Sequence, residues 1–140
     1  FRHYHFDIIQ APLNILDRQL IESGWAKKLK KRGVEIHTRS VFLQGLLLMN
    51  ENQRPAQFAR WDNVWKEWAK WLADSELTAL QACIRYVCSQ ELIDRVVVGV
   101  DTAQQLREIT SAMLGECPIP PTFGDIGDNR IYNPAKWSDL

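Results

Sequence analysis

The sequence lacks an excess of charge of either sign. Its 140 residues include 17 basic and 17 acidic side chains, so the formal net charge at pH 7 is zero. A protein that binds nucleic acid needs a basic face, and the one basic cluster, from Lys27 to Arg32, falls at the end of a predicted helix. Cations at that position complement the helix dipole. We therefore expect no nucleic-acid partner.

Long hydrophobic runs and cysteine are also scarce. No apolar stretch reaches the ~18–20 residues that a membrane span needs, and no secretory signal pattern is present. Cys83, Cys88 and Cys117 make an odd number without zinc-ligand spacing, which suits a reducing compartment. We expect a cytoplasmic protein with no membrane partner and no metal site. The first residue is Phe1 rather than Met, so we also expect a piece of a longer protein.

Two common nucleotide-binding motifs are missing, since neither G-x-G-x-x-G nor G-x-x-x-x-G-K-[ST] occurs. What the sequence contains instead is an alternation of strand and helix patterns. Strands are predicted at 6–10, 34–38 and 95–100. Helices are predicted at 19–32, 61–71, 75–90 and 103–114. This order predicts one α/β domain over residues 1–140 with a parallel sheet, and a proline-rich tail over 117–140 that is largely irregular and held by Trp137.

Three of these patterns predict burial. The unbroken valine run at 95–100 is typical of a parallel strand covered on both faces. Tryptophans at 61, 65, 68 and 71 form one helical stripe, which we interpret as a packed face rather than an aromatic ligand wall. Cys83 and Cys88 lie in a helical pattern and are expected to be small core residues.

Two predicted strands end in groups that can bind a ligand. Gly99, Val100 and Asp101 follow the valine run, and Thr102 and Gln105 match a capping box at the start of the next helix. A helix start beside a glycine offers free N–H groups to an anion such as phosphate. Arg39 and Ser40 stand at the tip of the 34–38 strand. The plainer alternative, an ordinary strand-to-helix turn, fits the same residues.

Three motifs in order resemble the C-terminal half of an aldo/keto reductase. They are Gln10-Ala11-Pro12-Leu13-Asn14-Ile15-Leu16-Asp17-Arg18, Arg39-Ser40-Val41-Phe42-Leu43-Gln44-Gly45-Leu46-Leu47, and the segment from Val97 to Glu108. The resemblance covers about residues 6–114. It implies a partial (β/α)8 (TIM) barrel in which the three strands are the sixth, seventh and eighth. It also implies a nicotinamide cofactor bound in extended form at the barrel mouth.

The resemblance assigns cofactor contacts residue by residue. Gln10 matches the glutamine that hydrogen-bonds the nicotinamide carboxamide, and Arg39 stands where many members stack an aromatic ring on the nicotinamide. Ser40, Phe42 and Gln44 match positions around the pyrophosphate. The positions that match the adenosine-phosphate loop and helix are Gly99, Val100, Asp101, Thr102, Gln105 and Glu108.

The cofactor that the resemblance implies is NADP or NAD. Asp101 and Gln105 are not the basic residues expected beside a 2′-phosphate, and Ile109 replaces a frequent asparagine. The Asp, Tyr, Lys and His that catalyse hydride transfer in the family come from earlier strands, so we expect no catalytic residue in this chain. Tyr4, Tyr86 and the three histidines, including His3 and His5 near the terminus, do not sit in those motifs.

The expected function is therefore that of the C-terminal portion of an NAD(P)-dependent oxidoreductase that reduces an aldehyde, ketone or sugar carbonyl. The chain contributes cofactor binding and is expected to be inactive alone. The alternatives are a small α/β ligand-binding module and a protein-interaction module without catalysis. Because three parallel strands cannot close a barrel, we expect open sheet edges and an uncovered apolar face, and hence either self-association or a repacked half-barrel with helices moved over that face.

Overall fold

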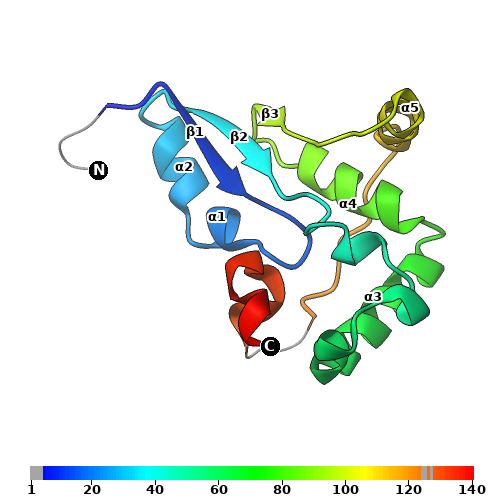
Figure 1. Ribbon diagram of the computed structural model, residues 1–140. Helices are drawn as coiled ribbons and strands as arrows, with labels where there is room; N and C mark the ends of the chain where they lie inside the picture. Colours follow the sequence, from blue (N-terminus) through cyan, green and yellow to red (C-terminus); the bar gives the residue numbers. More distant parts are fainter. Residues whose placement is uncertain (1–4, 124–125, 127) are drawn as a thin grey trace.

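The computed structural model describes residues 5–123, 126 and 128–140. Its centre is a parallel sheet in the order β1-β2-β3 (Figure 1), formed by β1 (Ile8–Pro12), β2 (Glu35–Arg39) and β3 (Arg95–Val96). The predicted α/β class and parallel pairing are confirmed. β1 starts and ends two residues later than expected. It accommodates Pro12 because this last residue turns its nitrogen away from β2, where no ladder bond is needed.

The connection from β1 to β2 is helical but broken in two. α1 (Gln19–Glu22) and α2 (Trp25–Lys30) replace the single helix predicted over 19–32. The break falls at Gly24, whose φ of 75° is left-handed and cannot continue a right-handed helix. Gly33, with φ of 74°, ends the crossover as the sequence predicted.

The two faces of the sheet differ in polarity. Val34, Ile36 and Thr38 alternate on the face that packs against α2 and are buried. The opposite face was expected to be apolar, and this expectation is wrong. Its side chains alternate with the buried ones and are mostly polar, namely those of Gln10, Glu35, His37, Arg39 and Arg95. The hydrogen bond with His37, aided by Arg95, lowers the pKa of Glu35 on this face.

The valine run is a much shorter strand than predicted. β3 has two residues, and Val97 donates its N–H to the Thr38 carbonyl at 2.8 Å before the segment leaves the sheet. Val97 and Val100 are 42% and 39% exposed, so the expected burial on both faces is also wrong. Among the described residues no strand pairs with the other edge of β3, so nothing extends the run as a buried strand.

The segment after β2 contributes a large part of the main core. It contains the 3-10 turns η1 (Leu46–Leu48), η2 (Glu51–Gln53) and η3 (Ala56–Trp61), followed by α3 (Asp62–Asp74). Trp61, Trp65 and Trp68 are buried, and the Trp65 ring N–H donates to the Phe58 carbonyl at 2.9 Å. The tryptophan stripe is therefore a packed face, as interpreted from its spacing.

α4 (Ala79–Cys88) begins at Thr78 rather than at the predicted 75. Cys83 on this helix is fully buried as expected, whereas Cys88 is exposed at the last helical position, contrary to expectation. Within the described part of the chain, no helix combines the length and the apolar character needed to cross a membrane.

The C-terminal part returns to the strand tips. α5 (Ala103–Ala112) lies beside α4 at the far end of the molecule from β1 (Figure 1). The tail then forms two 3-10 segments, η4 (Asn129–Tyr132) and η5 (Pro134–Asp139), which sit near α1. Trp137 packs edge-on against Phe58 with ring centroids 4.9 Å apart, and so anchors the tail as predicted.

Candidate functional site

A cavity of about 910 Å³ lies where β2 and β3 end. One wall is the loop after β2, from Ser40 to Gly45. The opposite wall is the segment Val97–Asp101 together with one face of α5. Eight of the eleven residues that the sequence assigned to the cofactor line this cavity. They are Ser40, Phe42, Gln44, Gly99, Val100, Asp101, Gln105 and Glu108.

The loop after β2 has an unusual backbone. Ser40, Leu43 and Gln44 have φ of 61°, 49° and 54°, although none of them is glycine. Such left-handed residues carry strain that the surrounding structure must hold, and they gather at ligand sites. Here the turn is closed by hydrogen bonds from Leu43 N–H to the Ser40 carbonyl and from Gly45 N–H to the Phe42 carbonyl.

Asn14 holds this loop from the tip of β1. Its side chain is 1% exposed and donates to the Ser40 carbonyl at 3.1 Å. Its Oδ1 accepts from the backbone N–H groups of Leu16 and Asp17, at 3.0 and 2.9 Å. Asn14 lies within the motif from Gln10 to Arg18, but the sequence predicted no role for it. An asparagine directly after a strand is typical of an ordinary turn.

The start of α5 forms the predicted cap with one difference. Thr102 Oγ1 accepts from the Gln105 N–H at 3.1 Å, so this N–H of the first turn is already paired. The Gln105 side chain accepts from the Asp101 N–H at 2.7 Å instead of from Thr102. The Gln105 amide therefore fixes the loop residue that lines the cavity, while Thr102 lies just outside the lining.

A second helix start reaches the same cavity and was missed by the sequence analysis. Thr78, Ala79 and Leu80, at the N-terminus of α4, are part of the lining. Thr78 and Gln81 form a reciprocal capping box. The sequence contains this pattern as T-x-x-Q before an apolar run, but the nearby Asp74-Ser75 pair predicts an earlier helix start. Two helix N-termini therefore contribute to one cavity, and both favour negative charge in a ligand.

The charged side chains of the cavity are acidic. Asp101 and Glu108 line it, and no lysine or arginine of the described part of the chain does. Glu108 accepts a hydrogen bond from Gln104 at 2.8 Å, which holds its carboxylate on the α5 surface. A carboxylate can accept a hydrogen bond from a ribose hydroxyl. A phosphate group placed directly beside Asp101 or Glu108, by contrast, would be repelled by their negative charge.

Gln10 and Arg39 lie outside this cavity, on the open face of the sheet. Arg39 Nη1 donates to Ser40 Oγ at 3.1 Å, so Arg39 borders the cavity through Ser40. It also lines a smaller cavity of about 270 Å³ together with Asp17 and Tyr132 of the tail. Burial raises the pKa of Asp17, although Arg39 opposes the shift. Gln10 pairs in register with His37, one step from Arg39 on the same face.

The described residues contain no group of three or more His, Cys, Asp or Glu side chains able to hold a metal ion. His3 and Tyr4 lie outside the described residues. His5 is exposed, and His37 contacts Glu35 instead.

Comparison with known proteins agrees with this architecture. The model of the aldo/keto reductase family matches residues 2–120. Two structures of the aldo-keto reductase AKR11C1 from Bacillus halodurans, the holo and the apo form, superimpose with a TM-score of 0.60 at 17% identity. They cover 94% of this chain, whereas the chain spans only 43% and 44% of theirs. No curated protein gives a match.

The three strands, their parallel order and the position of the cavity at the strand ends are those of part of a (β/α)8 barrel. The family match extends over most of the chain. The chain therefore belongs to the aldo/keto reductase family.

Proposed function

We propose that this chain is the cofactor-binding C-terminal portion of a nicotinamide-dependent oxidoreductase that reduces an aldehyde, ketone or sugar carbonyl. Family membership supports an oxidoreductase. The observation that carries the cofactor assignment is the convergence of two capped helix starts and a strained loop on one cavity of about 910 Å³. When bound, the cofactor supplies a hydride, and this chain supplies the groups that hold it.

The residues of the chain fit such a cofactor in a definite order. Ala79 and Leu80, at the start of α4, line the cavity, and their backbone N–H groups are those proposed to meet a diphosphate without a lysine or arginine, as helix N-termini do elsewhere. The side chains proposed to contact the adenosine half are those of Asp101, Gln105 and Glu108. Gln10 and Arg39, on the open face beyond Ser40, are proposed to contact the nicotinamide.

The charge of the cavity favours NAD over NADP. Among the described residues, the charged ones that line it are Asp101 and Glu108. A carboxylate accepts a hydrogen bond from a ribose 2′-hydroxyl, and it repels a 2′-phosphate. We expect NADH to bind at least about tenfold more tightly than NADPH, which corresponds to about 1.4 kcal/mol.

Titration of the chain with NADH and NADPH, followed by quenching of tryptophan fluorescence, tests both points. Gln105→Arg, which adds a cation to the cavity, should tighten NADPH binding and so reduce the preference for NADH over NADPH. Ser111→Arg is the matched control, because Ser111 is exposed on the same helix and lies outside the lining. Failure of both cofactors to bind would contradict the proposal. Tighter binding of NADPH than NADH would contradict the NAD preference alone.

Reduction of the substrate requires more than this chain. We propose that the catalytic groups lie in the part of the parent protein that precedes these strands, and that the chain alone does not oxidise NADH with any carbonyl compound. We also propose a cytoplasmic location, which the three free thiols support.

A further inference from the structure

The smaller cavity at the ends of β1 and β2, which has the C-terminal tail as one wall, is lined by polar groups. It measures about 270 Å³, and seven of the nine residues that line it carry a polar side chain. The other two are Pro12 and Pro134, and Ser40 lines this cavity as well as the larger one. Because ligand sites are ordinarily lined mostly by apolar side chains, this polar cavity favours a ligand with many hydrogen-bonding groups.

The tail is held in place as one wall of the polar cavity. Arg18 Nη2 donates to the Pro121 carbonyl at 2.7 Å, and the Arg18 guanidinium lies 5.4 Å from the ring centroid of the buried Phe123. The Gln19 amide donates to the Tyr132 hydroxyl at 3.0 Å. A ligand therefore meets a wall that is already fixed, and its binding free energy is not reduced by ordering the tail.

Asp17 offers the cavity a hydrogen-bond acceptor that the fold leaves partly unused. The residue is 7% exposed, and its Oδ1 accepts from the Gln19 N–H at a long 3.4 Å. Its Oδ2 accepts from no described donor and is not among the described side-chain atoms sealed from solvent without a partner. The open space beside Asp17 is the polar cavity and a groove of about 700 Å³ along β1. A carboxylate taken out of water needs a donor, and a ligand hydroxyl can supply one.

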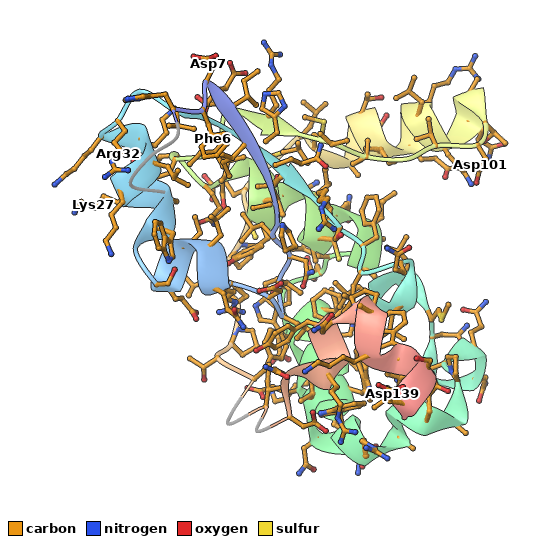
Figure 2. The ribbon with its side chains drawn as sticks, turned by 60° about the vertical axis from the view of Figure 1, so that its left-hand side comes forward. Phe6, Asp7, Lys27, Arg32, Asp101 and Asp139 are labelled. Carbon is orange, nitrogen blue, oxygen red and sulfur yellow. The ribbon has the colours of Figure 1, made fainter. Side chains whose placement is uncertain are left out.

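Arg39 supplies donors to the same cavity. Its Nη1 donates to Ser40 Oγ at 3.1 Å, and its other N–H groups bond to no described residue. The basic end of α2, with Lys27 and Arg32, lies far from the tail (Figure 2). Arg39 is therefore the cation among the described lining residues, and Asp17 is the anion.

We propose that the polar cavity binds the hydroxyl groups of a short polyhydroxylated carbonyl substrate, with Asp17 accepting from one hydroxyl and Arg39 donating to another. This assignment rests on the proposed oxidoreductase function, and it selects a sugar carbonyl from the three substrate classes named there. The Arg39 guanidinium then presents its flat face to the nicotinamide and its N–H edge to the sugar. Because Ser40 borders both cavities, the sugar lies next to the nicotinamide end of the cofactor.

The chemistry of the lining disfavours the other substrate classes. The opposite charges of Asp17 and Arg39 give an ionic ligand of either sign no advantage, whereas a neutral hydroxyl both donates and accepts. An apolar aldehyde or ketone would displace water from both side chains without replacing its hydrogen bonds. The volume lies just below the range of drug-sized sites, which suits a chain of roughly three to five carbons rather than an oligosaccharide.

Titration of the ¹⁵N-labelled chain with xylitol, with and without NAD⁺, tests the proposal. Xylitol is a five-carbon polyol and is not itself a carbonyl substrate, so it reports binding alone. We expect saturable amide shifts at Asp17, Gln19, Tyr132 and Asn133, with a dissociation constant in the millimolar range. 1-Pentanol, which has the same number of carbons and one hydroxyl, should give no saturable shift at these amides.

Two variants and a matched control test the residues. Asp17→Ala removes the charged acceptor and should weaken xylitol binding at least about tenfold. Asn133→Ala should weaken it several-fold without loss of circular dichroism signal, because this side chain lines the cavity and bonds to no described residue. Glu22→Ala is the control, because Glu22 is an exposed carboxylate of α1 that lines the groove but not the polar cavity. Neither test residue lines the larger cavity, so NADH affinity should not change.

Three results would overturn the proposal. They are the absence of saturable xylitol shifts up to about 100 mM in a chain that binds NADH, equal xylitol affinity in the unmodified chain and both test variants, and binding of 1-pentanol at the same amides at least as tight as that of xylitol. Xylitol binding at these amides in a chain that does not bind NADH would contradict the proposed cofactor function and leave the polyol site standing.

Discussion

Replacement of Asn14 by alanine should weaken both the fold and the proposed cofactor site. The side chain is buried and makes three hydrogen bonds, to the Ser40 carbonyl and from the N–H groups of Leu16 and Asp17. Alanine leaves all three backbone groups without this partner. Each buried group left unpaired costs about 1–3 kcal/mol. Partial hydration lowers the sum, so we expect the free energy of unfolding to fall by about 3–5 kcal/mol in urea denaturation.

A milder variant separates stability from binding. Asn14→Asp keeps the oxygen that accepts from Leu16 and Asp17 but loses the donor to the Ser40 carbonyl. Because Ser40 opens the strained loop of the cavity, this variant should bind NADH more weakly, by about tenfold. Ile15→Val is the matched control, because it removes a methylene from the next buried residue at a cost of about 0.5–1.5 kcal/mol and leaves the hydrogen bonds of Asn14 in place. Its NADH affinity should match that of the unmodified chain.

Two results would refute this reasoning. An Asn14→Ala variant within about 1 kcal/mol of the unmodified chain would mean that the three hydrogen bonds contribute little. An Asn14→Asp variant with unchanged NADH affinity would mean that Asn14 does not set the geometry of the loop.

Three further predictions follow from burial and charge. Trp68→Ala should lower the free energy of unfolding by about 3–5 kcal/mol in urea, because it empties a buried site, and a loss below 1 kcal/mol would contradict the packed-face interpretation. Burial raises the pKa of the Cys83 thiol far above its ordinary value, so Ellman's reagent should modify the exposed Cys88 in the folded chain and reach Cys83 only on unfolding. Arg130 holds the pKa of Asp128 at about 2, below the unfolded value of about 3.9, so the stabilisation from this pair is present above pH 4 and is lost as the pH falls toward 2. Asp128→Asn should flatten the pH dependence of urea unfolding in that range, and an unchanged curve would contradict the assignment.

Much of the architecture could be predicted because it depends on local patterns. The β-branched residues of β2, the left-handed Gly33 and the Thr102 cap were all visible in the sequence, and all are found. The strand-helix order then fixed which strand ends meet. Ser40 and Asp101 accordingly line one cavity, although about 60 residues separate them.

The features that could not be predicted depend on tertiary context. The valine run is a good strand by composition, but the length of a strand is set by its neighbours, and among the described strands β2 alone pairs with β3. The start of α4 depended on a choice between two capping patterns a few residues apart. The polar residues of the open face alternate along the strands with the residues that α2 buries. The sequence pattern alone does not predict which of these two faces helices cover, so the polarity of the open face could not be predicted.

The central claim is that the ends of β2 and β3 and the starts of α4 and α5 form one cofactor cradle. Titration of the ¹⁵N-labelled chain with NADH, followed by amide chemical shifts, tests it most directly. We predict that the largest shifts fall in the loop from Ser40 to Gly45, at Ala79 and Leu80, and between Gly99 and Gln105. Saturable shifts confined to other segments, or no shifts at millimolar NADH, would contradict the account.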